Sequence, residues 1–251
     1  MKQRGQITIF VIIGLGIIFA IILYFVLSGK FDIKPTTLTF PNTNEDIRKC
    51  VEDTLKDSVE VMLPQGGYVN PSLYKLYQDS KVAFLCYSVN YYARCQMQEP
   101  NYISRLASEI KLYSQNKIED CFYAAKKNYE GKSFKVILNK SGMEIKFNSK
   151  EIIVKINKEM QLEKSGKKEN FNNFEYKVSS PIFNLGNTAL EIANQEARFC
   201  DFNPAVHDAI YTDMDITKVE RGDARIYLIE DRLTGKVLKI AIRSCALIPG
   251  I

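Results

Sequence analysis

The sequence predicts an α+β protein, in which an N-terminal transmembrane helix precedes a disulfide-linked domain of helices packed on an antiparallel β-meander. Three observations predict this class. Residues 7–27 are all uncharged and mostly aliphatic or Phe, which matches the roughly 20 apolar residues of a bilayer span. All the cysteines follow that run. Further along, the helical spacing of apolar residues gives way to alternation over residues 133–180.

Composition restricts the class of protein. The chain of 251 residues is 46% hydrophobic, with 13 Gly and 8 Pro, which excludes collagen-like and disordered chains. Its net charge of +5 comes from 34 basic and 29 acidic residues that are evenly mixed, so we expect no nucleic-acid partner. The single histidine, His207, lacks the partners of a hydrolytic or zinc site and is expected to be a surface or capping residue. We therefore expect no enzymatic activity, no metal and no cofactor.

The chain divides into four predicted parts. These are a cytoplasmic stub and transmembrane anchor (1–29), an extended tether (30–43), a helical subdomain with a β-hairpin (44–128), and a β-meander with a helix and a C-terminal hairpin (129–251). The apolar run is too long for a secretory signal peptide, so we expect it to be retained. An even number of cysteines after it predicts disulfides, a cytoplasmic N-terminus and an extracellular C-terminal domain held at the cell membrane. A cytosolic domain with free or metal-bound thiols is the alternative.

The first helix of the domain should begin at Asn44 or just before, with Thr43 or Asn44 as its cap. Pro64, Gly66 and Gly67 should end it. Its apolar residues recur at steps of three and four, and they are Ile47, Val51, Leu55, Val59 and Met62.

A β-hairpin is expected over 81–97, because apolar residues alternate there around a two-residue loop at Asn90 and Tyr91. That register would place Cys86 opposite Cys95, at a separation that a disulfide accepts.

A long helix should follow over 100–126 and pack against the first one. Both helices carry a cysteine on or beside their apolar face, which predicts a disulfide between Cys50 and Cys121. The residues of the expected buried face are Ile103, Ala107, Ile110, Ser114, Ile118, Cys121 and Ala125.

Four alternating segments then predict an antiparallel meander with one buried and one solvated face. The segments are 134–138, 143–147, 152–162 and 174–178. A helix over 182–199 should cover the sheet, a loop with solvated aspartates should span 201–215, and a last hairpin should join 224–230 to 236–245. Cys200 and Cys245 would then form the third disulfide.

Two clusters of loop residues are candidate binding surfaces. They are Gln65, Gly66, Gly67 and Tyr68 after the first helix, and Tyr91, Tyr92 and Arg94 on the hairpin, where exposed rings beside a guanidinium suit recognition. The helix stop explains the glycines equally well, and the rings can equally pack in the core. Asn139 begins an N-glycosylation sequon. Gly16 and Ala20 form a small-xxx-small pair that lets another helix approach the apolar run.

Four stretches of sequence carry a resemblance to a known family. They are RGQITIF at 4–10, CVE at 50–52 with QGGY at 65–68, NQEARFC at 194–200, and AIRSC at 241–245 with the final PGI. Together they resemble uncharacterised single-pass membrane proteins of DPANN archaea, which implies an archaeal membrane protein without a transferable activity. The N-terminus separately resembles the class III signal of archaeal pilins, which implies cleavage between Gly5 and Gln6 and retention of the apolar helix for filament assembly.

These features predict a membrane-anchored archaeal cell-surface protein with a structural or interaction role, assembling laterally or as a pilin-like subunit. Its expected partners are the lipid bilayer and either further copies of itself or another surface protein. The alternative is a tethered extracellular binding subunit for a soluble ligand or a host-cell partner.

Overall fold

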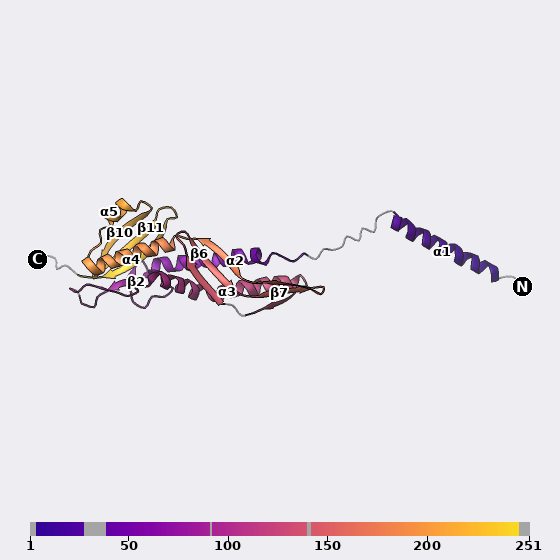
Figure 1. The fold of residues 1–251 in the computed structure, drawn as a ribbon, viewed down its shortest axis with the longest axis horizontal. Coiled ribbons are helices and arrows are strands. Elements are labelled where there is room, and N and C mark those ends of the chain that lie inside the picture. Colours follow the sequence, from indigo (N-terminus) through magenta and orange to yellow (C-terminus); the bar gives the residue numbers. More distant parts are fainter. Residues whose placement is uncertain (1–3, 28–38, 91, 140–141, 246–251) are drawn as a thin grey trace. The chain divides into compact units, whose positions relative to one another are not determined.

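The structure of the chain, a computed structural model, describes residues 4–27, 39–90, 92–139 and 142–245 (Figure 1). The chain forms two separate units, Met1–Phe40 and Pro41–Ile251. Helix α1 (Arg4–Leu27) lies in the first unit, and the other helices and the strands lie in the second. The second unit is α+β, as predicted, and its largest sheet combines strands from both predicted subdomains.

Helix α1 coincides with the predicted apolar run, and the side chains described within it are those of residues 11–24. Most of these side chains are exposed. Within the described residues, no helix combines the length and the hydrophobicity needed to cross a bilayer. The predicted membrane span therefore stays a prediction, and residues 30–38 of the predicted tether lie outside the described residues.

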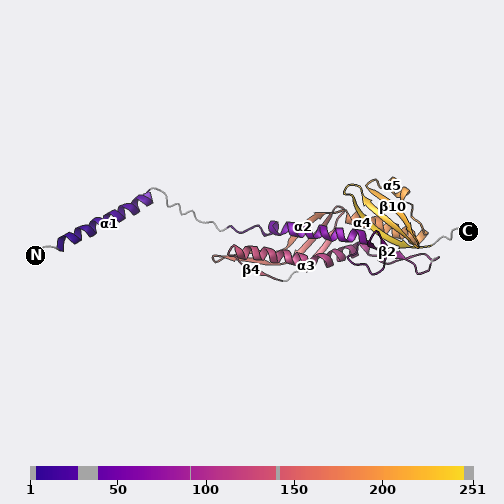
Figure 2. The same cartoon turned by 180° about the vertical axis from the view of Figure 1, so that it is seen from behind.

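Helices α2 (Thr43–Met62) and α3 (Tyr102–Gly131) lie side by side in the second unit (Figure 1 and Figure 2). All the predicted apolar residues of α2 are buried. The cap was predicted one or two residues too late: Asn42 caps α2 by accepting a hydrogen bond from the amide of Glu45. The Cys50–Cys121 disulfide, with a Cα–Cα distance of 5.9 Å, joins the two helices and confirms the predicted pair.

The N-terminal part of α3 is rotated relative to the prediction. Tyr102 and Leu106 are fully buried there, whereas the predicted face passed through Ile103 and Ala107. The hydroxyl of Tyr102 donates a hydrogen bond to the backbone oxygen of Gly66 at 2.8 Å, so this side of α3 faces the turn after α2.

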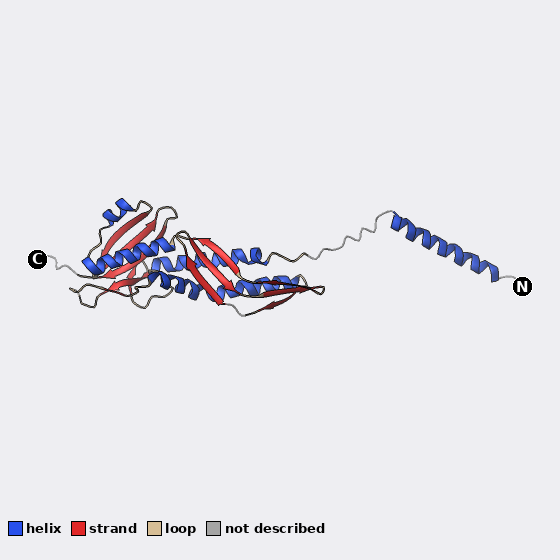
Figure 3. Ribbon diagram, in the orientation of Figure 1, coloured by secondary structure: helices blue, strands red, loops and turns tan. Residues whose placement is uncertain are grey.

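The largest sheet has the strand order β1-β2-β12-β11-β10, with β3 paired to β2. Strands β2 and β12 run parallel, and the other pairs are antiparallel. Helix α4 (Ile182–Phe199) lies across this sheet (Figure 3). The strands are β1 (Tyr74–Tyr77), β2 (Ser80–Tyr87), β3 (Gln96–Met97), β10 (Met214–Arg221), β11 (Ala224–Asp231) and β12 (Lys236–Arg243). Helix α4 and the β11–β12 hairpin were predicted, whereas β1, β10 and the short helix α5 (Pro204–Ile210) were not.

The predicted two-residue hairpin loop is wrong, although its disulfide is present. Cys86 pairs with Met97 in the β2–β3 ladder, so Cys95 lies in a longer loop over 88–95 instead of on the facing strand. The Cys86–Cys95 disulfide closes that loop, with a Cα–Cα distance of 5.3 Å. Tyr91, at the predicted tip, lies outside the described residues.

The predicted single meander is wrong. The region forms two three-stranded antiparallel sheets, β4-β7-β8 and β5-β6-β9, which interleave along the chain and pack on α2 and α3. The strands are β4 (Lys135–Leu138), β5 (Gly142–Phe147), β6 (Glu151–Asn157), β7 (Met160–Lys164), β8 (Lys167–Phe171) and β9 (Phe174–Ser179). The chain changes sheets at Lys158, a buried residue whose ammonium group donates to Glu119 Oε2 at 2.6 Å.

Candidate functional site

One surface of the second unit gathers hollows, exposed apolar side chains and a buried histidine. We call it the α4–α5 face, and it comprises Asn187, Glu191, Gln195, Phe199, Val206, His207, Ile210, Tyr211 and Asp213. Three adjoining hollows of about 410, 330 and 300 Å³ lie along it, and Glu191 lines all three.

The sequences of α4 and α5 explain how each helix contributes to this face. Helix α4 is amphipathic: its inner residues, such as Leu185 and Ile192, are fully buried, so Asn187 and Glu191 point outward. Helix α5 begins at Pro204 after Asn203, whose side chain accepts from the amide of Ala205 at 3.1 Å.

Several apolar side chains on the α4–α5 face are exposed. Phe199 at the end of α4 is 72% exposed, and Val206 and Ile210, one turn apart on α5, are 58% and 67% exposed. Tyr211 is half-exposed beside them. Val206, Ile210 and Tyr211 line one hollow together, and Phe199 lines the adjoining one. Exposed apolar side chains gathered in this way mark an interaction surface more often than a single exposed residue does.

His207 is buried at the base of this surface, with 5% of its area exposed. Its ring contacts Tyr211, with a centroid distance of 4.6 Å, and Phe202, at 5.9 Å. Nδ1 lies 3.7 Å from Asp208 Oδ1, and Nε2 lies 3.9 Å from Glu191 Oε2. Both distances exceed a hydrogen bond, and within the described residues Nδ1 has no hydrogen-bond partner. The expectation of a surface or capping histidine is therefore wrong.

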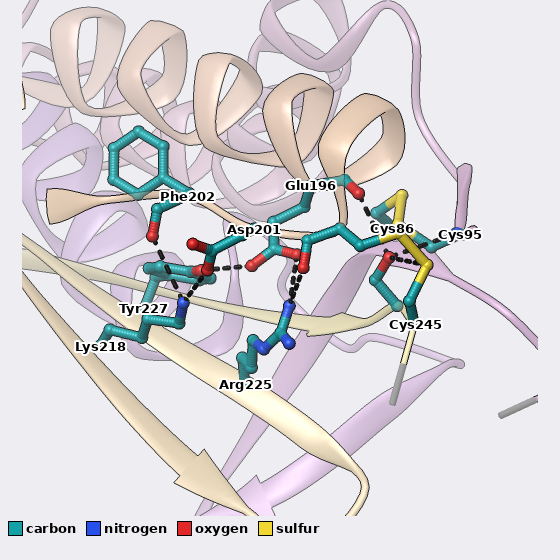
Figure 4. A network of polar contacts seen from close by, with 11 residues as sticks. Cys86, Cys95, Glu196, Asp201, Phe202, Lys218, Arg225, Tyr227 and Cys245 are labelled. Atoms are coloured by element: carbon teal, nitrogen blue, oxygen red, sulfur yellow. Dashed lines mark hydrogen bonds and ion pairs between the residues drawn. A yellow bond between two sulfur atoms is a disulfide. The ribbon is translucent and has the colours of Figure 1, made fainter. Parts of the chain in front are cut away.

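A second polar cluster lies behind α4 and has a structural character (Figure 4). Glu196 is fully buried; it accepts from the Tyr227 hydroxyl and, at 2.6 Å, from Arg225 Nη1, which also donates to the backbone oxygen of Cys200. The backbone oxygen of Glu196 accepts from Ser244 Oγ at 3.2 Å. Burial, followed by the hydrogen bond to Glu196, raises the pKa of Tyr227 well above its usual value, so the phenol remains a donor. This cluster fixes α4 to β11.

The third disulfide lies beside that cluster. Cys200 and Cys245 are bonded with a Cα–Cα distance of 5.4 Å, which confirms the predicted pair. All six cysteines are thus in disulfides. Among the described residues, no group of His, Cys, Asp and Glu side chains could hold a metal ion.

The chemistry available on the α4–α5 face is apolar contact together with the carboxylates and imidazole at its base.

Most of the predicted cluster at the end of α2 is packed against neighbouring elements, and Tyr68 lines a hollow of about 180 Å³. Gly66 and Gly67 are buried with positive φ angles of 72° and 80°, and a Cβ on Gly67 would lie 2.3 Å from Leu106 Cδ2. Gln65 donates to backbone oxygens on both sides of the turn. Tyr68 lies half-buried under the guanidinium of Arg105, 5.3 Å from the ring centroid.

The other predicted residues are placed separately from the α4–α5 face. Tyr92 and Arg94 are exposed in the disulfide-closed loop. Asn139 is exposed and donates to Glu159 Oε2 at 2.9 Å, but residues 140 and 141 of its sequon lie outside the described residues. Gly16 and Ala20 are exposed on α1. The predicted cleavage site at Gly5 and Gln6 lies in the first turn of α1, where side chains are not described.

Comparison with known proteins leaves the α4–α5 face without a template. No family model matches the chain, and neither a curated protein nor a solved structure is significantly similar to it. The predicted resemblance to an archaeal membrane family stays a prediction.

A signal for the α4–α5 face is present in the sequence. Asn203-Pro204 is a helix start, with a capping side chain followed by proline at the first helical position. Val206 and Ile210 follow at a spacing of four, which places both on one side of a short helix. The prediction of a loop over 201–215 gave more weight to its aspartates than to this helix-start signal.

Proposed function

We propose that the protein is a membrane-anchored surface protein whose second unit binds another protein through the α4–α5 face. The observation that carries this proposal is the group of exposed apolar side chains around the hollows, namely Phe199, Val206, Ile210 and Tyr211. Their burial against a partner would supply the main driving force for association.

Two features support the anchored and extracellular part of the proposal. Residues 7–27 are uncharged and mostly aliphatic or Phe, which matches the roughly 20 apolar residues of a bilayer span, and they lie within helix α1. Three disulfides in the second unit fit an oxidising compartment outside the cytosol.

Lateral assembly through α1 is a second candidate function. Gly16 and Ala20 lie one turn apart, and a Cβ placed on Gly16 would meet no atom within 4 Å. Small residues at this spacing let two helices approach closely in lipid. Processing between Gly5 and Gln6 and a pilin-like role would belong to this alternative.

Site-specific photo-cross-linking in native membranes tests the main proposal. A photoreactive residue at Ile210 should give an adduct of one defined mass, because this side chain is 67% exposed on the α4–α5 face. The matched control is Leu112, which is 70% exposed on α3, and it should give none. The protein should also resist extraction by alkaline carbonate.

Equal adducts at both positions, or none at Ile210, would contradict the proposed binding surface. A dimer-sized adduct that forms at Gly16 and not at Ile210 would favour lateral assembly instead. Release of the unreacted protein by carbonate would contradict the membrane anchor.

A further inference from the structure

We infer that the segment bound at the α4–α5 face presents a Lys or Arg side chain flanked by apolar residues, with its cationic group against Glu191 and His207. The inference rests on the proposed function and adds the chemistry of the partner. Three observations carry it: the acidic character of the face, the arrangement of acceptors around His207, and the apolar rim.

Carboxylates outnumber cations on this face, although the chain as a whole carries a net charge of +5. Glu191 and Asp213 line the hollows, Asp208 lies directly behind His207, and Arg198 is the cation of the lining. Nearby acids are already paired, Asp201 with Lys218 and Asp215 with Arg232. Within the described part of the chain, Asp213 has no ion pair.

The ring of His207 lies between two carboxylates. Nδ1 and Asp208 Oδ1 are both inaccessible to solvent, so a proton on Nδ1 is the arrangement that avoids two facing lone pairs there. Nε2 then faces Glu191 Oε2 across 3.9 Å as a second acceptor. Two acceptors at this separation can share one donor, and an ammonium or guanidinium group can donate to both.

The apolar rim excludes the simplest alternative ligands. Phosphate and nucleic acid would meet carboxylates, and a free inorganic cation would leave Phe199, Val206 and Ile210 uncovered. A peptide segment that alternates apolar and basic side chains satisfies both parts of the face. Charge complementarity therefore favours a basic, apolar protein segment.

His207 is the one histidine of the chain, so NMR signals from a labelled histidine ring can be assigned to it without overlap. The full chain, made without a histidine tag and labelled with ¹³C,¹⁵N-histidine, is studied by NMR in detergent micelles. The probes are three matched peptides, N-acetyl-Ile-Arg-Ile-amide, N-acetyl-Ile-Gln-Ile-amide and N-acetyl-Ile-Glu-Ile-amide. The Arg peptide should shift the ring signals saturably and bind about tenfold more tightly than the Glu peptide, as expected for one charge-assisted contact.

Two variants test the placement of the cation. Glu191→Gln should weaken the Arg peptide about tenfold and leave the Gln peptide unchanged. Its control is Glu175→Gln on β9, a carboxylate of nearly equal side-chain exposure (42% against 44%), which should change neither affinity. Phe199→Ser should weaken all three peptides alike.

Equal binding of the Arg and Glu peptides, or an Arg peptide insensitive to Glu191→Gln, would overturn the inference. Ring signals that shift with protein concentration alone, and that the Arg peptide does not reverse, would also overturn it by showing that a second copy occupies the face. If the Ile210 cross-link persists in any of these cases, the proposed binding function stands and only the chemistry of the partner is wrong.

Discussion

Glu196 shows how one residue connects distant parts of the second unit. It lies on the last turns of α4, bonds to Arg225 and Tyr227 on β11, and accepts from Ser244 beside the third disulfide. Such a carboxylate is tolerated in the interior because cationic and hydroxyl donors surround it. Glu196 therefore contributes most to the stability of the folded state when all of its hydrogen-bond partners are present.

Glu196→Gln should lower the free energy of unfolding by about 3 kcal/mol, because it leaves the mostly buried guanidinium of Arg225 without a counter-charge. Urea unfolding of the full chain in micelles, followed by far-UV circular dichroism, measures this loss. Glu191→Gln, at a partly exposed position, should change stability by less than about 0.5 kcal/mol. Similar effects for the two variants would show that the buried pair contributes little.

The burial of Glu196 was predictable in part. Leu185, Ala189, Ile192 and Ala193 follow helical spacing, and the next position of that face is Glu196. Periodicity thus places an acidic residue on the buried side. The identity of its partners was not predictable, since Arg225 and Tyr227 belong to a strand whose register depends on the assembled sheet.

At the scale of elements, the turn after α2 shows the difference between local and long-range information. The sequence predicts a helix end at Gly66 and Gly67, and the structure confirms it with two positive φ angles. Nothing local indicates that Tyr102 and Leu106 close over Gly67. Because this close approach belongs to the packing of α3, the same glycines read equally well as a binding loop.

Gly67→Ala should destabilise the protein more than Gly166→Ala does. Both glycines have positive φ angles, 80° and 77°, so both variants carry the backbone penalty of about 1 kcal/mol. Only at position 67 would the new Cβ also clash, with Leu106 Cδ2 at 2.3 Å and the Tyr102 hydroxyl at 2.5 Å. We expect an additional loss of about 1–3 kcal/mol in urea unfolding. Equal losses would mean that α3 shifts freely.

The interleaved sheets explain why the meander prediction failed. Ile152, Val154, Ile156, Met160 and Leu162 keep one alternation, so the apolar pattern predicts one long strand although Lys158 interrupts it. Lys158 occupies an inward position of that alternation, between β6 and β7, where the chain passes from one sheet to the other. A lysine at an inward position of the alternation was therefore the sequence feature that could have indicated the end of one strand and the start of the next.

At the scale of the whole molecule, two of the three disulfides connect elements that are far apart in sequence, and the third closes a short loop. Their sequence separations are 71 for Cys50–Cys121, 9 for Cys86–Cys95 and 45 for Cys200–Cys245. All three predicted pairs are present, although Cys86–Cys95 was predicted from a hairpin register that is wrong. The sheet order was not predictable, since parallel pairing of β2 with β12 leaves no local trace.

Removing the Cys50–Cys121 disulfide by Cys50→Ala with Cys121→Ala should cost about 4 kcal/mol, against about 3 kcal/mol for the Cys86–Cys95 pair, because the first closes a longer loop. Urea unfolding of the two double variants measures the order. Iodoacetamide should label no cysteine of the natural protein before reduction. Labelling of all six thiols without a reductant would falsify both the bridges and the oxidising location.

The parallel pairing of β2 with β12 also determines when the largest sheet can form during synthesis of the chain. Phe84 faces Ala241 in this ladder, and a ribosome working at about 5–20 residues per second needs roughly 8–30 s to pass from one to the other. During that interval the inner edge of β2 has no neighbour and is open to the wrong strands. The largest sheet can therefore be completed only after β12 (Lys236–Arg243) has been synthesised.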